Sequence, residues 1–288
     1  MFRTNEIQNN TALRESFFTL AEDTFGLSFR DWYASGYWTD NYLPHCLVED
    51  GRVVANVSVN RIPAVWRDRA RRYIQLGTVM THPQYRGRGL SRQLMEWVLE
   101  LWGEKSDAVY LYANDSVLHF YPKFGFERAT EYQFTLPFQA KQMALARKLR
   151  MDDPADVKTL QRCYQKSNPF CALTVTDNFG LLMFYCSQRY RDSIYYIEEF
   201  DAVAVMDWEN GQPCCLDLFC NKMVLPGDIL ASVLGCKTGV APLGFAPKEA
   251  LAAAAEPIAA EDETLFVLQG GENPFCTQKV RFPVLSHA

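Results

Sequence analysis

Tyr73-Ile-Gln-Leu-Gly-Thr-Val-Met-Thr-His-Pro-Gln-Tyr-Arg-Gly-Arg-Gly-Leu-Ser-Arg92 is the most informative stretch of this chain. An apolar strand leads into a Gly87-Arg88-Gly89 turn, and the turn opens an amphipathic helix. The first backbone N–H groups of a helix have no partner within it and carry partial positive charge. Because glycine has no Cβ, a phosphate can approach those N–H groups closely. Arg86 and Arg88 add full charges, so the segment is predicted to bind a phosphate.

Three phosphate-binding motifs can be compared with this segment by their spacing. The chain has no Gly-x-x-x-x-Gly-Lys-Ser/Thr string, which excludes a Walker loop. A dinucleotide fingerprint needs a third glycine where Arg92 stands, so that motif also fails. The motif that fits is Gln84-x-x-Gly87-x-Gly89, which resembles the pyrophosphate-binding motif of the GNAT acyl-CoA N-acetyltransferases.

The residues after the turn extend this resemblance. Apolar residues recur at helical spacing up to Gly103, a suitable helix end: Leu90, Leu94, Trp97, Val98, Leu101 and Trp102. A second strand over 108–113 ends at Asn114, a short helix over 114–121 carries Tyr121, and Gly125-Phe126 opens another strand. Their order and separation are similar to those of the family over residues 1–138. The resemblance implies an α/β GNAT fold, with a central mixed, mostly antiparallel sheet flanked by helices.

The first 65 residues agree with that architecture. Residues 8–25 are predicted to form a helix, followed by an aromatic-rich short helix and loop over 27–43. Two strands, 47–49 and 53–65, are predicted to form a hairpin around Asp50-Gly51, a strong two-residue turn signal. In the second strand Asn56, Ser58 and Asn60 alternate with valines. This polar stripe is either a solvated face or the lining of a cleft.

The rest of the chain is predicted to form a second, smaller α/β lobe. Residues 139–150 look like a connecting segment, and residues 151–288 form the lobe. Its expected elements are a helix over 178–189, strands over 195–207 and 213–220 joined at Asn210-Gly211, a helix over 228–234, and strands over 240–246 and 264–268. The lobe is either a degenerate GNAT-like unit without cofactor or an unrelated α+β domain, and Ala252–Ala255 is predicted to be helical.

Composition limits the partners and the location. The 288 residues are 48% hydrophobic with a net charge of −5, which suits well-filled cores in one large or two medium domains. No basic stripe indicates nucleic acid, no apolar run approaches a membrane span, and no signal peptide is recognisable, so a cytoplasmic protein is expected. Nine cysteines without paired spacing and four histidines predict no metal site. The oligomeric state cannot be inferred.

The resemblance implies that the cofactor is acetyl-CoA. Backbone groups of Val79, Met80 and Thr81 would bind the pantetheine arm, and an N–H near Val79 would polarise the thioester carbonyl. Asn114 matches a cofactor-contacting Asn of the family. The pyrophosphate would lie on the amides of Arg86, Gly87, Arg88, Gly89, Leu90 and Ser91.

The resemblance also implies catalytic roles. Tyr121 matches the family's helix Tyr, whose hydroxyl can protonate the departing thiolate; alternatively it only packs in the core. Many members carry a Glu on the strand before the turn, but residues 75–78 are Gln-Leu-Gly-Thr here, so a base from this strand is not expected. Asp40 and a water chain through Asn56 or Ser58 are candidates for the base.

The tail Pro283-Val-Leu-Ser-His-Ala288 is another candidate for the base. It is apolar enough to dock, so its carboxylate or His287 could reach the acceptor site. Alternatively, Val284 and Leu285 only pin the tail onto the core.

The acceptor site is the least defined part of the prediction. Trp38, Asp40, Asn56 and Ser58 are candidate substrate-binding residues. Trp32, Trp38 and Tyr42 either belong to the core or wall the acceptor site. The acceptor itself is expected to be an amine of a small molecule or peptide.

Two functions remain open. The first is an N-acetyltransferase that moves acetyl from acetyl-CoA to a primary amine by direct attack, with Tyr121 as general acid. The second is a non-catalytic acyl-CoA-binding regulatory protein, which the missing strand Glu favours.

Overall fold

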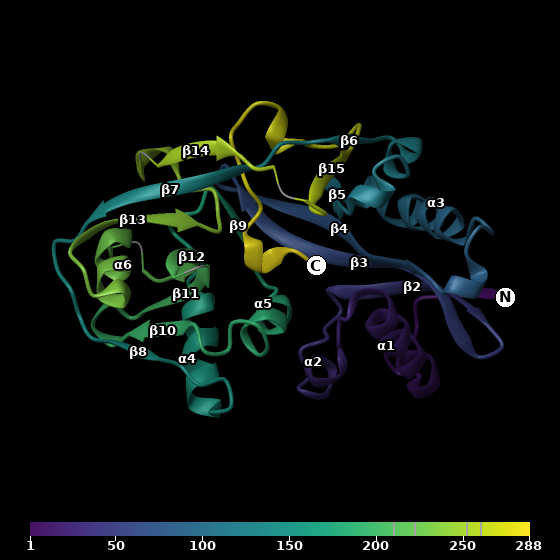
Figure 1. Ribbon diagram of the computed structural model, residues 1–288, viewed down its shortest axis with the longest axis horizontal. Helices are drawn as coiled ribbons and strands as arrows, with labels where there is room; N and C mark the ends of the chain where they lie inside the picture. Colours follow the sequence, from purple (N-terminus) through teal and green to yellow (C-terminus); the bar gives the residue numbers. More distant parts are fainter. Residues whose placement is uncertain (210, 222, 252, 260) are drawn as a thin grey trace.

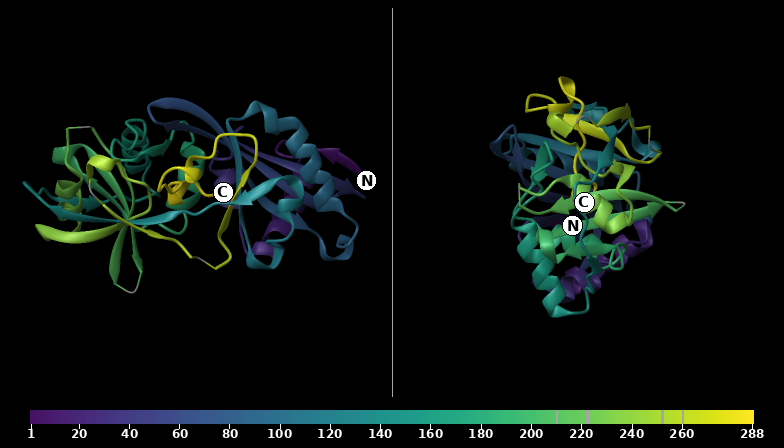
Figure 2. Two further views of the ribbon diagram at one scale, coloured as in Figure 1. Left: turned by 90° about the horizontal axis from the view of Figure 1, so that it is seen from above. Right: turned by 90° about the vertical axis from the view of Figure 1, so that its left-hand side faces the viewer.

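The structure is a computed structural model that describes residues 1–209, 211–221, 223–251, 253–259 and 261–288. Two mixed sheets lie side by side along the longest axis of the molecule, each with helices packed on it (Figures 1 and 2). This arrangement confirms the predicted class, α/β with a GNAT-type sheet and a second lobe. Among the described helices, none is long and apolar enough to cross a membrane.

The first sheet has the strand order β1-β2-β3-β4-β5-β15-β6, and β9 pairs with the end of β3 on the edge opposite β4. Neighbouring strands are antiparallel except β4 and β5, which are parallel. The predicted hairpin is confirmed, since β2 and β3 flank Asp50-Gly51 with both turn residues at positive φ. The strands are β1 (Phe2–Thr4), β2 (Tyr42–Glu49), β3 (Arg52–Trp66), β4 (Arg69–Thr81), β5 (Ala108–Ala113), β6 (Phe126–Arg128), β9 (Leu173–Val175) and β15 (Thr264–Leu268).

Helices α1 (Thr11–Phe25) and α3 (Leu90–Trp102) cover opposite faces of this sheet. In β2 the side chain of Leu47 packs with the α3 cluster, whereas Cys46 and Val48 pack with the α1 cluster. Alternation along a strand directs successive side chains to opposite faces, so both faces are buried. The short α2 (Arg30–Ala34) follows α1 and packs Trp32 into the same aromatic cluster.

The second sheet has the strand order β14-β7-β13-β12-β11-β10-β8. Helix α6 packs with Ala204, while α4 and α5 pack with Val203 and Val205 on the other face. The strands are β7 (Tyr132–Gln139), β8 (Ala146–Lys148), β10 (Ile194–Ile197), β11 (Ala202–Glu209), β12 (Gln212–Phe219), β13 (Thr238–Leu243) and β14 (Ala254–Pro257). The helices are α4 (Pro154–Tyr164), α5 (Phe179–Cys186) and α6 (Pro226–Leu234).

The expected boundary at residue 138 does not separate the two sheets, because each sheet contains a strand from the other side of that boundary. Strand β7 belongs to the second sheet, where it pairs with β13 and β14. Strand β15, expected in the second lobe, lies instead between β5 and β6 of the first sheet. The chain therefore crosses between the lobes at least twice, and the first sheet includes residues from both halves of the sequence.

Several local expectations also differ from the structure. Helix α4 was not predicted, and the segment 139–150 contains the edge strand β8. The alanine run is not helical where it is described, since Ala254 and Ala255 begin β14; Ala252 lies outside the described residues, as does Asn210 of the predicted turn. The region 114–121 forms no α-helix. Short 3-10 helices occur at Pro83–Tyr85, Gly103–Lys105, Asp115–Val117, Tyr121–Phe124, Glu198–Phe200, Glu249–Leu251, Pro274–Cys276 and Val284–Ser286.

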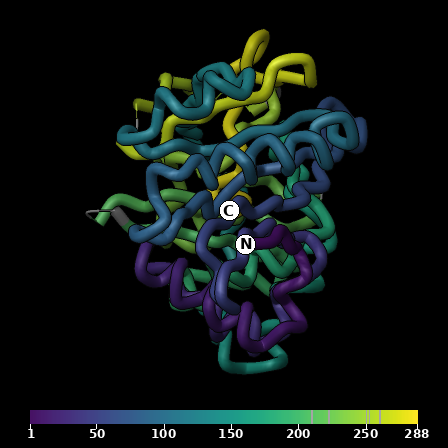
Figure 3. Tube along the Cα trace, turned by 90° about the vertical axis from the view of Figure 1, so that its right-hand side faces the viewer, coloured from purple at the N-terminus to yellow at the C-terminus, as the bar shows by residue number. Residues whose placement is uncertain are grey.

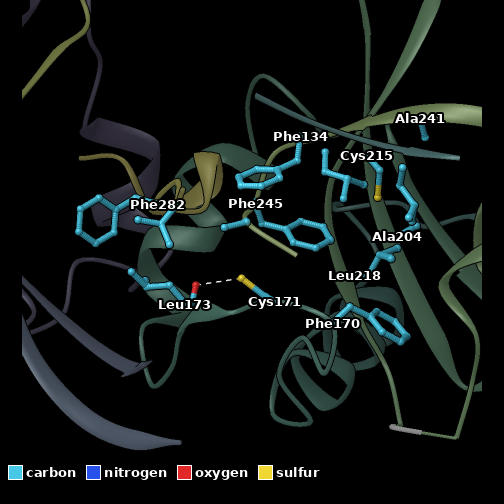
Figure 4. Close-up of a cluster of buried hydrophobic side chains, with 14 of the residues drawn as sticks. Phe134, Phe170, Cys171, Leu173, Ala204, Cys215, Leu218, Ala241, Phe245 and Phe282 are labelled. Atoms are coloured by element: carbon cyan, nitrogen blue, oxygen red, sulfur yellow. Dashed lines mark hydrogen bonds between the residues drawn. The ribbon is translucent and has the colours of Figure 1, made fainter. Parts of the chain in front are cut away.

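One hydrophobic cluster joins the lobes. It contains Tyr73 and Tyr110 of the first sheet together with Phe134 and Phe245 of the second lobe. Phe282 of the tail stacks on Tyr110 with a centroid distance of 3.9 Å. Figure 4 shows part of this cluster, including the hydrogen bond from Cys171 to the carbonyl of Leu173. The tail packs into this shared core, so residue 288 lies near the middle of the molecule, as Figures 1 and 3 show.

Candidate active site

A groove opens where β4 and β5 separate. The two strands pair only from Tyr73–Ala108 to Leu76–Leu111, although β4 continues to Thr81. The cavity at this split has a volume of about 550 Å³. Its lining includes the predicted cofactor residues Val79, Met80, Thr81, Arg86, Ser91 and Asn114, together with Tyr121, Tyr112 and Ala288.

A β-bulge in β4 shapes the inner end of this groove. Asn56 pairs with Met80 and Ser58 with Gly77, so Thr78 and Val79 together oppose the single residue Val57. Thr78 has a φ of 48°, an uncommon value for a β-branched residue. Its carbonyl accepts a hydrogen bond from Asn56 Nδ2 at 2.8 Å, and its hydroxyl lies 3.0 Å from Tyr42 Oη. This network holds the strained residue in place.

The glycine turn forms the outer end of the groove. Gly87 and Gly89 both have positive φ, 76° and 73°, and no atom lies within 4 Å of the position a Cβ would take on either. Arg86 donates to the Thr81 carbonyl at 3.3 Å, and the Ser91 and Thr81 hydroxyls are 2.7 Å apart. The unpaired N–H groups at the start of α3 therefore lie beside an open, cationic turn. Gly87, Arg88, Gly89 and Leu90 form the turn without lining the groove, and Arg88 packs over Tyr85.

Tyr121 lies in the groove wall with 5% of its surface exposed. Burial raises the pKa of its phenol to about 12, so it is protonated at neutral pH. Its ring contacts Phe120 and Phe266, so the aromatic core fixes its orientation. Tyr121 therefore packs in the aromatic core and also lines the groove, so its two sequence interpretations are compatible.

A second cavity of about 310 Å³ lies on the other side of Thr78. Helix α5 forms one wall and the α2 region forms another. The described lining is Leu27, Phe29, Trp32, Thr39, Asn41, Tyr42, Asn60, Thr78, Asn178, Leu181, Phe184, Tyr185, Gln188, Arg189, His287 and Ala288. Thr78 and Ala288 line both cavities, so the groove and this second cavity meet at these two residues.

The tail is seated at this junction by specific contacts. The Ala288 oxygen accepts a hydrogen bond from Gln75 Nε2 at 2.8 Å. It lies so close to Gly77 that a Cβ there would be 2.4 Å from it. The His287 carbonyl accepts from Tyr185 Oη at 2.5 Å, and buried Leu285 anchors the segment.

A buried polar chain lies behind the tail. Tyr112 Oη is 2.9 Å from His287 Nε2 and donates to Glu131 at 3.1 Å, and the Phe282 N–H donates to the same carboxylate at 2.7 Å. Burial raises the pKa of Glu131 to about 7. Burial and the nearby Arg281 lower the pKa of His287 to about 3, so its imidazole is neutral at pH 7.

The predicted acceptor residues are only partly brought together. Trp32 and Tyr42 line the second cavity, but Trp38 packs in the core and Asp40 is exposed outside that lining. Asn56 and Ser58, the alternating polar residues, are fully buried in the bulge network and reach neither cavity. Their hydrogen bonds to Thr78 and Tyr42 help to fix the conformation of these two lining residues.

Sequence reasoning did not single out Tyr112, Glu131 or Tyr185 as site residues, although it predicted the helix over 178–189 that corresponds to α5. Each lies far along the chain from the residues it meets, and no short motif marks them. The sequence feature that could have indicated the tail contact is the absence of a Glu on this strand. Gln75 provides a hydrogen-bond donor to the tail, and Gly77 leaves room for it.

Comparisons with known proteins agree with this geometry. Residues 9–126 match the acetyltransferase (GNAT) family. None of the curated proteins compared with the chain matches it.

Solved structures share the fold over most of the chain. A conserved protein of unknown function from Enterococcus faecalis V583, described as a probable N-acyltransferase, is 14% identical with a TM-score of 0.59, covering 92% of this chain and 71% of its own. A GCN5-related N-acetyltransferase from Kribbella flavida is 18% identical with a TM-score of 0.52 and the same coverage. Eis1 from Mycobacterium abscessus is 12% identical with a TM-score of 0.54, covering 87% of this chain and 70% of its own.

At such identities the structural likeness shows the fold, and the family match adds the class of enzyme. Residues 9–126 of this chain are therefore a GNAT acetyltransferase domain, and the protein is an acyltransferase.

Proposed function

We propose that the protein is an N-acetyltransferase that moves acetyl from acetyl-CoA to a primary amine. The observation that carries this proposal is the meeting of two cavities at Thr78 and Ala288, with Tyr121 in the wall of the groove. One cavity is suited to the cofactor and the other to the acceptor.

The groove residues fit acetyl-CoA in chemical type. The positive-φ glycines and the start of α3 offer N–H groups to a pyrophosphate, and Arg86 adds a charge. Among the described residues, no strand pairs with β4 beyond Leu76 on its β5 side, so the backbone groups from Gly77 to Thr81 are suited to the pantetheine amides. Acetyl-CoA would supply the activated acyl group here.

The chain's own residues order the two proton transfers. The proton that the attacking amine loses passes to water in the second cavity, where the Ala288 oxygen can accept a hydrogen bond from the amine. Tyr121 donates its phenolic proton to the sulfur as the C–S bond breaks and the C–N bond forms. Gln75 Nε2 holds the Ala288 oxygen at 2.8 Å, and Gly77 leaves the space for it. The tail thus places an acceptor oxygen beside strand β4, which has no Glu at residues 75–78.

Cofactor binding is tested first, by the melting temperature with and without acetyl-CoA. Ligand at about a hundred times its Kd stabilises the folded state by about 2.7 kcal/mol. NAD and ATP serve as controls that should give no shift. The absence of a shift at millimolar acetyl-CoA would contradict the whole proposal.

Tyr121→Phe tests the general acid. We expect kcat to fall by about 10²-fold or more while the Kd for acetyl-CoA is unchanged, because only the proton donor is removed. Tyr195→Phe is the matched control, since Tyr195 lines neither cavity. Unchanged turnover in Tyr121→Phe would reject this role. Acetyl-CoA binding without turnover on any amine would instead support the regulatory binding protein.

A further inference from the structure

The second cavity has a wall chemistry that selects among amines. Phe29, Trp32, Tyr42 and Phe184 provide aromatic surface, and Leu27 and Leu181 provide aliphatic surface. Its volume of about 310 Å³ is at the lower end of the roughly 300–1,000 Å³ of small-molecule sites. The cavity therefore suits a compact apolar body.

The aromatic walls are held rigidly before any ligand binds. Trp32 Nε1 donates to the Gly180 carbonyl at 2.7 Å, which locks the indole against α5. Phe184 of α5 packs against Phe29 and Trp32 at centroid distances of 5.5 and 5.8 Å. Since both lobes contribute to this contact, the pocket is preorganised by the joining of the lobes.

The groups around the cavity can hold one ammonium and disfavour a second. No Asp or Glu side chain is among its described lining residues, and the Ala288 oxygen is available there as an acceptor for one ammonium. Arg189 lines the cavity, and its guanidinium forms an ion pair with the Asp207 carboxylate at 3.6 Å. Burial, Tyr190 and Glu263 raise the pKa of Tyr185, which lines the cavity, but Glu263 itself is not a lining residue. A second ammonium inside the cavity would lose its hydration, and no described lining side chain is a carboxylate that could replace that hydration.

We infer that the acceptor is a primary monoamine on an arylalkyl or alkyl body, and that polyamines and other polycations are poor acceptors. This inference rests on the proposed function, because it assigns the acceptor role to the second cavity. The ammonium end would lie at Ala288 and Thr78, and the apolar body would lie among Phe29, Trp32 and Phe184.

Two matched pairs of amines separate charge from apolar contact. Hexylamine and 1,6-diaminohexane have the same chain and differ by one charge, while 2-phenylethylamine and ethylamine differ by one ring. CoA release with acetyl-CoA gives kcat/KM for each. We expect hexylamine to exceed the diamine, and phenylethylamine to exceed ethylamine, each by about tenfold or more.

Gln188→Glu tests the electrostatic part of the inference. Gln188 lines the cavity with an exposed side chain, so the substitution adds a carboxylate with little change in shape. We expect the preference for hexylamine over the diamine to shrink by about threefold or more. Gln161→Glu, which adds the same charge on α4 outside the cavity, should leave the preference unchanged.

The outcomes separate the two levels of the proposal. Equal or better turnover of the diamine, or of ethylamine, would overturn the monoamine inference while the acetyltransferase function stands. Acetyl-CoA binding with no CoA release from any of the four amines, or from spermidine, would overturn the proposed function and the inference with it.

Discussion

Gly77 and Ala288 form a contact that one methyl group would break. A Cβ on residue 77 would lie 2.4 Å from the Ala288 oxygen and 2.9 Å from its carbonyl carbon. Gly77 does not have positive φ, so its backbone alone would accept alanine. The requirement for glycine at this position therefore comes from the tail.

Gly77→Ala is expected to displace the tail and slow acyl transfer. Because Ala288 is exposed and adds little buried surface, we expect kcat to fall by about 10- to 100-fold with a small change in melting temperature. The measurement is CoA release with a saturating amine. Gly103→Ala is the control, because no atom lies within 4 Å of its Cβ position. Wild-type kcat in a folded Gly77→Ala variant would remove the tail from the mechanism.

Residues in contiguous motifs were predictable, and residues joined over long distances were not. The Gly87 and Gly89 turn and Tyr121 follow from local spacing; Tyr121 lines the groove, whereas the two glycines form the turn beside it. Gln75 and Ala288 are 213 positions apart, so their contact depends on the whole fold. The tail lies at the junction of the two cavities, and its role as the base stays a prediction.

At the level of elements, α5 joins the acceptor cavity to the second lobe. Gly180 packs its Cα so close to the loop after α2 that a Cβ would be 2.3 Å from the Tyr37 carbonyl oxygen. The same residue's carbonyl holds Trp32. Glycine is thus used in a helix against its own propensity, because the backbones must approach.

Gly180→Ala should destabilise the protein although it improves helix propensity. The propensity gain is at most about 1 kcal/mol, whereas forcing apart a packed contact costs about 1–3 kcal/mol. We also expect the KM for 2-phenylethylamine to rise, since the Trp32 wall moves with α5. Urea unfolding and kinetics measure both effects, with Gly103→Ala as the helical-glycine comparison. A more stable variant with unchanged KM would show that α5 does not set the cavity.

Element types were predicted best where periodicity was strong. Helix α3 and the β2–β3 hairpin follow directly from apolar spacing and from Asp50-Gly51. The alanine run failed because pairing with β7 outweighed the helix propensity of Ala254 and Ala255. The position of β15 in the first sheet could not be predicted from its own residues, because a short apolar strand fits either sheet.

For the whole molecule, buried carboxyl groups make stability depend on pH. Burial raises the pKa of Glu131 from 4.5 to about 7 and that of Asp217 from 3.8 to about 7. A raised pKa means that the folded state binds protons more tightly, so stability falls as pH rises from about 4 to 7. The lowered pKa of His287 acts oppositely below pH 6.5, but it offsets only one of the two carboxyl groups.

Asp217→Asn should flatten this dependence. The amide oxygen can still accept from Asn168 and from the Leu218 N–H, which now lie 2.6 and 2.9 Å from the carboxylate. Between pH 5 and 7 we expect the variant to lose about 2 kcal/mol less unfolding free energy than the wild type. Chemical denaturation at the two pH values measures this. Equal losses in both proteins would mean that Asp217 titrates normally.

The position of β15 also determines when the catalytic half can fold. During synthesis β5 and β6 emerge early, yet the strand that pairs with both follows only at Thr264–Leu268. Until then β5 is an open edge available to other chains. Such sequence-distant pairing slows folding and prolongs exposure to aggregation. We therefore expect a lower level of expression, which leaves fewer open edges present at one time, to raise the yield of active protein.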